Sequence, residues 1–347
     1  MKRILCLIVA LVMAVVLFAG CSGGAKTTLY LLNWGEYMDP ELLKEFEAQN
    51  PDIKVKMTTT TSNEEMYTVC ATEGTKIDIV VPSDYLVERF VQEDLLAELN
   101  FSNIPNFKYV EKAAQNRTFD PENKYSVPYF IGTVGIVYNK KLVNEEVDSW
   151  SILWNEKYAK KIMMYDSIRD SMMVALSSLG YDINTTNPEE LAEAGELLLA
   201  QKPLVRGYGT DNIKDDMIGG SVALAIDYSG SAVQAIMENE DLAYVVPKEG
   251  SNVWMDNLVV LKSSKNKEAA ERFINFMCEP EVAAQNSEFV GYTTPNDAAL
   301  EFVDEEFTSN SAYTIPDGVL DRCVYFKDLG DGLQLYNDVW MKVKTSS

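Results

Sequence analysis

The sequence contains no histidine. A serine or cysteine nucleophile therefore lacks the imidazole base that usually activates it, and a zinc ion lacks its usual nitrogen ligand. An enzyme built from this chain would have to use carboxylates, lysines or tyrosines for proton transfer. Because this absence argues against catalysis more strongly than any motif argues for it, we predict neither an enzymatic activity nor a cofactor.

Cysteines and basic residues are also scarce. The chain has 5 cysteines, and the wide spacing of Cys70, Cys278 and Cys323 suggests neither a disulfide framework nor a metal site. Its 30 lysines and arginines are outnumbered by 53 aspartates and glutamates, which gives a formal net charge of −23. Such a chain repels nucleic acid and attracts cations, although solubility alone explains most of an acidic surface. We therefore expect no nucleic-acid partner and no metal.

Long apolar runs are confined to the start of the chain. Two basic residues precede an apolar run over 4–19, which ends in Leu17-Phe-Ala-Gly-Cys21 and is too short for a comfortable transmembrane helix. This order predicts a signal peptide over 1–20, a diacylglyceryl group on Cys21 and a flexible tether over 21–27. The protein would then be anchored by lipid outside the cytoplasm, and the alternative is an uncleaved anchor.

Roughly 320 residues follow, more than one hydrophobic core usually holds, so two lobes are expected. Apolar strand patterns at 28–33, 53–57 and 77–81 alternate with helix patterns, the first of which begins at Asp39 and Pro40. This alternation predicts an α/β fold with helices covering a parallel sheet.

The glycine-punctuated stretch from 125 to 138 is predicted to cross to the second lobe, and the chain would return near Trp254. The predicted first lobe comprises 28–131 and 255–301. The second comprises 132–254 and 302–347, with a helix over 150–160.

Acidic and aromatic residues recur together at the ends of predicted strands. The groups are Trp34 with Glu36 and Tyr37, Asp84 with Tyr85, Asp166 with Asp170, Asp227 with Tyr228, and Trp254 with Asp256, and Tyr292 adds a ring. Ligands of open α/β sheets bind beyond the carboxyl ends of strands, so these groups predict one shared site. Rings attract ammonium groups and cover methylenes, while carboxylates fix direction, as a linear polyamine requires. Taken alone, each group is more simply interpreted as a half-buried aromatic turn whose acidic side chains are solvated.

Five motifs carry a resemblance to a known family. They are Asn33-Trp-Gly-Glu-Tyr37, Val81-Pro-Ser-Asp-Tyr85, Tyr125-Ser-Val-Pro-Tyr129, Trp254-Met-Asp256 and Gly291-Tyr-Thr-Thr-Pro-Asn296. With them the chain resembles the spermidine/putrescine-binding proteins of bacterial ABC importers over nearly its whole mature length. The resemblance implies a two-lobed periplasmic-binding-protein fold of type II, with mixed sheets, helical cover and a ligand cleft at the hinge. It also implies a monomer that binds a polyamine and docks on an ABC permease.

The resemblance also implies a set of site residues. Its ring walls would be Trp34, Tyr37, Tyr85, Tyr228, Trp254 and Tyr292, with Ser83 as a polar contact, Asp256 as the partner of an amine, and Glu36, Asp84, Ser167 and Asp170 completing the site. The chain departs from the family where Ser167 and Asp170 replace two acids in an Asp-x-x-Glu pattern. Tyr228 and Phe326 stand where tryptophan and glutamine are frequent. These changes leave the choice between spermidine and putrescine open.

Three other interpretations remain. The same fold would serve another organic cation, or a metal held by tyrosines and carboxylates. A glycosidase would need paired carboxylates, for which Asp166 with Asp170 or Asp227 with Asp256 are available. An adhesin or scaffold lipoprotein would need no cleft lined by rings.

Overall fold

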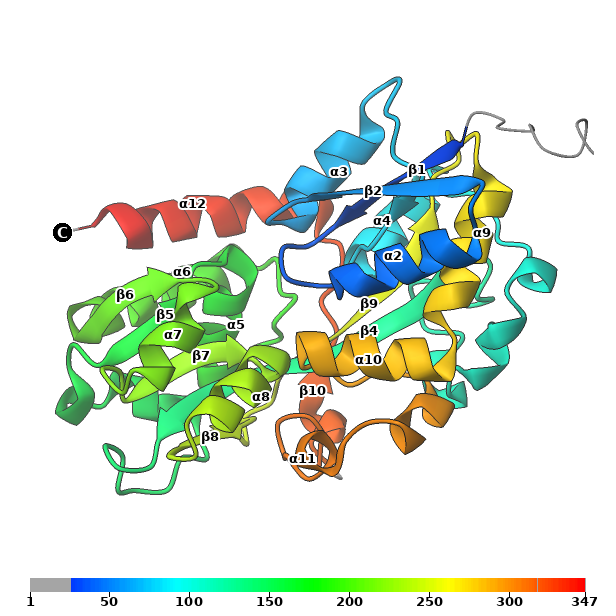
Figure 1. The fold of residues 1–347 in the computed structure, drawn as a ribbon. Helices are drawn as coiled ribbons and strands as arrows, with labels where there is room; N and C mark the ends of the chain where they lie inside the picture. Colours follow the sequence, from blue (N-terminus) through cyan, green and yellow to red (C-terminus); the bar gives the residue numbers. More distant parts are fainter. Residues whose placement is uncertain (1–25, 317, 347) are drawn as a thin grey trace, which may run out of the picture.

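The computed structural model describes residues 26–316 and 318–346 as two α/β lobes that lie side by side (Figure 1). The predicted signal peptide over 1–20 and the lipidated Cys21 lie outside the described residues. Within the part that is described, no helix has the length and apolar character that a bilayer span requires. The predicted α/β class, with mixed sheets and covering helices, is confirmed.

The first lobe is built on strands that follow one another in space as β2 (Ile53–Thr59), β1 (Thr27–Asn33), β3 (Ile79–Val80), β9 (Ser251–Val260) and the first part of β4 (Ser126–Asn139). β1 runs parallel to β2 and β3, whereas β9 is antiparallel to both β3 and β4. Its helices are α2 (Pro40–Gln49), α3 (Asn63–Ala71), α4 (Asp84–Gln92), α9 (Lys267–Met277) and α10 (Pro280–Val290).

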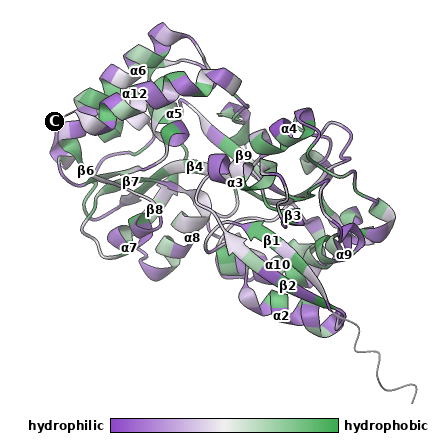
Figure 2. Ribbon diagram, turned by 90° about the horizontal axis from the view of Figure 1, so that it is seen from above, coloured by the Kyte–Doolittle hydropathy of each residue, from purple (hydrophilic) through white to green (hydrophobic). Residues whose placement is uncertain are grey.

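Local capping explains where the first helices begin. The Asp39 side chain accepts the Glu41 N–H at the start of α2, and proline at the first helical position has no N–H to satisfy. Ser62 caps α3 in the same way by accepting the Glu65 N–H. In Figure 2 hydrophobic and hydrophilic residues alternate along the covering helices, and in α2 the buried residues are Leu42 and Phe46. The helices therefore present one apolar face to the sheet.

The second lobe continues the same sheet through β4. Its strands are β7 (Leu224–Tyr228), β5 (Ile162–Tyr165), β6 (Val205–Gly209) and β8 (Leu242–Val245), and its helices are α5 (Ile168–Leu179), α6 (Pro188–Gln201), α7 (Asn212–Ile218), α8 (Ser229–Glu238) and α12 (Leu333–Thr345). β4 pairs with β9 over residues 126–133 and then with β7 over 134–138. The two lobes are thus joined by strands that belong to both, and the exact lobe boundaries stay a prediction.

One predicted helix differs from the structure. The predicted helix over 150–160 is a pair of short 3₁₀ helices, η4 (Trp150–Trp154) and η5 (Glu156–Tyr158), because Asn155 between them is extended and caps the second by accepting the Lys157 N–H. The assignment of 302–347 to the second lobe stays a prediction. Within it, α12 packs on α5 and α6, and Tyr313 contacts the Ser287 hydroxyl of α10 at 2.7 Å while sharing a core cluster with α7 and α8.

Candidate functional site

The predicted site residues meet where the two lobes join. Tyr37 follows β1, Ser83 follows β3, Asp170 follows β5, and Tyr228 ends β7. Trp254 and Asp256 were predicted to end a strand. In the structure they lie inside β9, which passes between the lobes. Asp256 reaches the same place because its backbone forms an isolated bridge with Ser83.

Four aromatic side chains form a continuous row, which we call the ring row: Tyr37, Tyr292, Trp254 and Tyr228. Ring centroids are 5.7 Å apart for Tyr37 and Tyr292, 4.8 Å for Tyr292 and Trp254, and 6.0 Å for Trp254 and Tyr228. Every pair is edge-to-face, an arrangement favoured by the ring quadrupoles. The row runs from the first lobe to the second, and Tyr165, which the sequence prediction missed, extends it beyond Tyr228 at 4.9 Å.

Gly132 fixes the position of Trp254 in the ring row. The two residues are partners in the pairing of β4 with β9, and the indole lies across the glycine so closely that an added Cβ would overlap the indole atom Cζ2. The indole can therefore adopt this position only because residue 132 has no side chain.

Replacing Gly132 with alanine is expected to displace the indole and weaken ligand binding about tenfold, since overpacking of this kind costs about 1–3 kcal/mol. The control is Gly207→Ala in β6, where the nearest atom to the added Cβ would be Met163 Sδ at an ordinary 3.6 Å. Titration calorimetry of both variants measures the effect. Equal affinities in the two variants would contradict this role of Gly132.

Buried polar atoms without a protein hydrogen-bond partner are concentrated at the ring row. Among the described residues, ten buried side-chain atoms have no such partner, and half of them belong to predicted site residues: Trp34 Nε1, Tyr37 OH, Asp170 Oδ1, Trp254 Nε1 and Asp256 Oδ1. An unsatisfied buried polar group costs about 1–3 kcal/mol, and native proteins retain few of them. Trp34 directly follows β1. The other four atoms, which are two carboxylate oxygens, the Tyr37 hydroxyl and the Trp254 indole N–H, belong to the ring row and its two acids and indicate a place built for a polar ligand.

Burial shapes the electrostatics of both carboxylates. It raises the pKa of Asp256 to about 6, against the opposing effect of the neighbouring Ser83 and Tyr37 hydroxyls. It also raises the pKa of Asp170, against the hydroxyls of Ser167 and Tyr228 and the positive charge of Arg169. Tyr228 donates its hydroxyl to Asp170 Oδ2 at 2.9 Å, so the other carboxylate oxygen stays unpartnered. Each carboxylate would gain most from a cation that replaces its lost hydration.

Two predicted site acids do not belong to this cluster. The Glu36 side chain is 88% exposed, because it lies on a turn, and its nearest cation is Lys214 of the second lobe at 3.9 Å. Asp84 is buried, but its two oxygens accept the N–H groups of Tyr85 at 2.7 Å and Met255 at 2.9 Å. Burial raises the pKa of Asp84 to about 8. Its carboxyl group ties α4 to β9, and both of its oxygens already accept a backbone N–H.

The remaining predicted residues lie at the edges of the cluster. Tyr85 and Ser83 both receive hydrogen bonds from the Asn63 side chain, at 2.9 and 3.1 Å. Ser167 is the N-cap of α5, with its Oγ 3.4 Å from the N–H of Asp170. These contacts hold the polar groups beside the acids, and the sequence prediction did not include Asn63.

A second layer of residues supports Tyr37 from behind. Asn286 donates to the Tyr129 hydroxyl at 2.7 Å, and this hydroxyl donates to the Tyr37 carbonyl at 3.0 Å. The Asn286 side chain also accepts the Asp39 N–H at 2.9 Å. Tyr129 was visible in a sequence motif, whereas no sequence signal marked Asn286.

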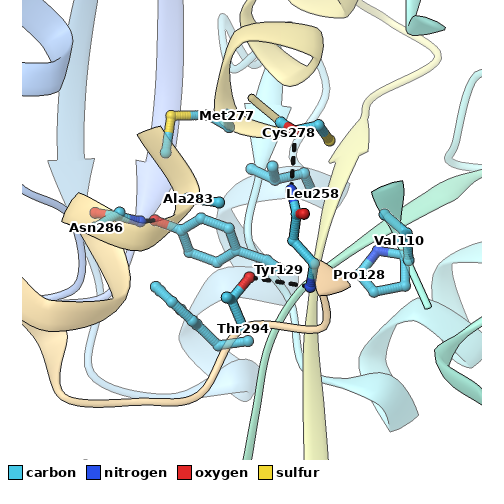
Figure 3. A pocket seen from close by; sticks show the side chains of 11 residues that line it. Val110, Pro128, Tyr129, Leu258, Met277, Cys278, Ala283, Asn286 and Thr294 are labelled. Atoms are coloured by element: carbon cyan, nitrogen blue, oxygen red, sulfur yellow. Dashed lines mark hydrogen bonds between the residues drawn. The ribbon is translucent and has the colours of Figure 1, made fainter. Parts of the chain in front are cut away.

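A cavity of about 10 Å³ lies beside this layer (Figure 3). Its lining includes Tyr129, Asn286, Thr294 and Leu258. A volume of this size holds one water molecule and no larger ligand. The candidate binding site is therefore the cluster at the ring row. Among the residues of the described ranges, no group of three or more acidic, cysteine or histidine side chains is placed to hold a metal.

Comparison with known proteins places the chain in a family. The profile of the bacterial extracellular solute-binding proteins matches residues 41–315. The chain is 36% identical over 320 residues to a spermidine/putrescine-binding periplasmic protein of Salmonella typhimurium, with 91% of each chain covered.

Solved structures of similar proteins agree with this assignment. One is the spermidine/putrescine ABC transporter substrate-binding protein of Streptococcus pneumoniae, with 39% identity, a TM-score of 0.80 and coverage of 92% of this chain and 99% of that one. Another is the Tp0655 lipoprotein of Treponema pallidum, with 30% identity, a TM-score of 0.82 and coverage of 91% and 99%. The α/β solute-binding fold implied by the sequence motifs is thereby confirmed, as is the prediction of a binding protein rather than an enzyme. The chain belongs to the family of bacterial extracellular solute-binding proteins.

Proposed function

We propose that the protein is an extracytoplasmic receptor that binds a polyamine between its two lobes and delivers it to an ABC importer. The observation that carries this proposal is the pair of buried carboxylates, Asp256 and Asp170, each with one unpartnered oxygen and joined by the ring row. The named ligands of the relatives, spermidine and putrescine, have the chemistry that such a pair would bind.

The contribution of each group follows from its chemistry. A protonated amine at each end of the ligand would form a charge-assisted hydrogen bond to one carboxylate. An ammonium beside an aromatic face gains a further 0.5–2 kcal/mol or so, and the flat rings would cover the methylenes between the amines. Because Asp256 belongs to the first lobe and Asp170 to the second, the same ligand would favour the closed arrangement of the two lobes.

The membrane anchor is part of the proposal. Cys21 lies six residues before β1, whose first residue is Thr27, so a lipid on Cys21 would hold the first lobe close to the membrane surface. A related protein of known structure is described as a lipoprotein. Incorporation of a labelled fatty acid into the protein and into Cys21→Ser tests the anchor: label in the protein and none in the variant supports it, and no label in the unaltered protein would rule it out.

Titration calorimetry tests the proposed ligand. The described residues contain the whole sheet and the site residues discussed above, so the chain from Ser22 retains the whole site. This chain, freed of bound solute by unfolding and refolding, is titrated with putrescine, spermidine and spermine, and with butylamine as a control with a single charge. One-to-one binding of at least one polyamine, and none of butylamine, supports the proposal. No binding of any polyamine to folded protein would refute it.

The proposed site predicts that affinity falls as the pH is lowered from 7 to 5. The pKa of the Asp256 carboxyl in the free protein is raised to about 6, so below that pH a proton competes with the ligand ammonium, which stays protonated throughout. One such group weakens binding about tenfold over this range, and the raised pKa of Asp170 adds to the effect. Calorimetry in buffers of different ionisation enthalpy measures both the affinity and the protons released. A constant affinity between pH 5 and 7 would contradict the pairing.

A further inference from the structure

The start of β1 lies at one edge of the first lobe, beside three other segments. Thr27 donates its N–H to the Asp52 carbonyl at 2.9 Å, and the Asn266 side chain donates to the Thr28 carbonyl at 3.3 Å. Figure 1 shows the turn from β9 to α9 beside the start of β1. We call this part of the surface the anchor edge and define it as residues 26–28, 47–54, 73–78 and 261–272 with Asp94.

The anchor edge is close to Cys21 in the chain. Five residues, 22–26, separate Cys21 from the first residue of β1. The six residue steps from Cys21 to Thr27 reach at most about 22 Å. A lipid on Cys21 would therefore keep the anchor edge within a short distance of the bilayer, whichever way the rest of the protein turns.

Basic residues are more frequent at the anchor edge than elsewhere in the protein. The edge contains seven basic and seven acidic residues, whereas acids outnumber basic residues two to one in the rest of the chain. Two of its acids, Asp78 and Glu271, are buried. The side chains that face solvent at this edge are therefore more basic than acidic, although the whole chain carries a formal charge of −23.

Three lysines of the anchor edge are free of acidic partners. The other four basic side chains pair with acids of the same edge, as Lys54 with Glu47, Arg272 with Asp52, Lys262 with Asp94, and Lys267 with Glu271. Lys26, Lys76 and Lys265 are exposed, and none of them takes part in an ion pair among the described residues. Two exposed acids, Glu73 and Glu268, are also unpaired there. The free charge of the edge is therefore positive.

The ligand site lies at the other end of the same strands. β1 runs from Thr27 at the anchor edge to Asn33, and Trp34 and Tyr37 follow it. Six residue steps of a strand cover about 20 Å. A surface in contact with the anchor edge would therefore leave the ring row uncovered.

We propose that the anchor edge lies against anionic phospholipid headgroups and so orients the protein on its membrane. The proposal rests on the lipid anchor that is part of the proposed function. The lipid supplies the attachment, and the free lysines determine which face turns toward the bilayer. Lysines near an anionic leaflet are attracted to it over about a Debye length, and the acidic remainder of the surface is repelled. The anchor edge is both within reach of the bilayer and without an excess of acids.

Amine labelling of the full chain on vesicles tests this orientation. The protein, purified with its lipid, is inserted into vesicles of phosphatidylcholine alone or of an equal mixture with phosphatidylglycerol. An acetylating ester is added, and mass spectrometry gives the labelling rate of each lysine. Lys140 and Lys161, exposed lysines of the second lobe that form no ion pair among the described residues, are controls within the same molecule.

Labelling of Lys76, Lys262 and Lys265 should be at least about threefold slower on the anionic vesicles than on the neutral ones, while Lys140 and Lys161 should change less than about 1.5-fold. In about 1 M salt, which shortens the Debye length to about 3 Å, the difference should disappear. Equal rates on the two kinds of vesicle, or a difference that persists in this salt, would overturn the inference and leave the anchor standing. Failure of the full chain to stay with either vesicle would overturn the anchor, and the inference with it.

A matched pair of double variants tests whether the lysines cause the orientation. Lys76→Gln with Lys265→Gln removes two charges from the anchor edge, and Lys140→Gln with Lys161→Gln removes two from the second lobe. The protection of Lys262 on anionic vesicles should fall at least about twofold in the first variant and stay unchanged in the second. Equal protection of Lys262 in the two variants would overturn the inference. Polyamine binding should be the same in both, since neither pair contacts the ring row.

Discussion

Replacing Asp256 with asparagine is expected to weaken polyamine binding by about 30- to 5,000-fold, because loss of one partner of a buried charge pair costs about 2–5 kcal/mol. Asp256 is 5% exposed and has one unpartnered oxygen beside the ring row. Asparagine has nearly the same shape, so the rings keep their positions while the charge disappears. Calorimetric titration with putrescine and spermidine measures the loss.

The same substitution should not destabilise the ligand-free protein. Burial raises the pKa of Asp256 to about 6 in the folded state, so at pH 7 the ionised carboxylate costs folding up to about 3 kcal/mol relative to an ordinary aspartate. This cost grows as the pH rises above the unfolded-state value and is fully present above the folded-state value. Asparagine removes it, so the free energy of unfolding at pH 7 should equal or exceed that of the unaltered chain.

A matched control separates pairing from general attraction of cations by an acidic protein. Asp166 lies four residues before Asp170, but its side chain is 42% exposed and pairs with Lys344 at 2.7 Å. Asp166→Asn also removes one negative charge, yet it should change the affinity less than about twofold, since charges in water are well screened. Equal losses in the two variants would show that net charge, rather than Asp256, determines binding.

Elements of the fold that depend on local chemistry could be predicted from the sequence. Asp39 and Ser62 cap α2 and α3 by accepting N–H groups only two and three positions further along the chain. The change of partners along β4 depends on strands that lie far away in sequence, so no local pattern reveals it. The predicted helix over 150–160 was wrong for a different, local reason: Asn155 in its middle caps a new 3₁₀ helix, and the sequence prediction overlooked it.

In the site, too, local patterns could be predicted from the sequence and contacts between distant segments could not. The recurrence of rings and acids at strand ends was sufficient to find the ring row. It could not separate Asp84 from Asp256, since both stand beside aromatic residues and only the folded backbone shows that Asp84 is occupied by the N–H groups of Tyr85 and Met255. The burial of Arg169 could not be predicted from the sequence either, because an arginine in a helix is usually solvated. Arg169 is buried against Phe326, which belongs to a segment near the far end of the chain.

Replacing Trp254 with alanine is expected to weaken polyamine binding at least about thirtyfold, the effect typical of truncating a buried aromatic residue at the centre of a binding site. Trp254 is the ring that joins Tyr292 of the first lobe to Tyr228 of the second. Its loss would remove the central wall of the site. It would also leave a cavity that costs about 3–5 kcal/mol in stability, so melting curves must accompany the titrations.

Trp254→Phe separates the two things that the indole offers. Phenylalanine keeps a flat apolar wall and loses the Nε1 group, which has no hydrogen-bond partner in the protein. If the wall over the methylenes carries the affinity, this variant should retain binding within about tenfold, far above that of Trp254→Ala. If the phenylalanine variant loses binding as completely as the alanine variant, the indole N–H must act as a donor to the ligand or to a bound water. A polyamine whose nitrogens are all protonated has no acceptor for that N–H, so this result would require a bridging water or a different class of ligand.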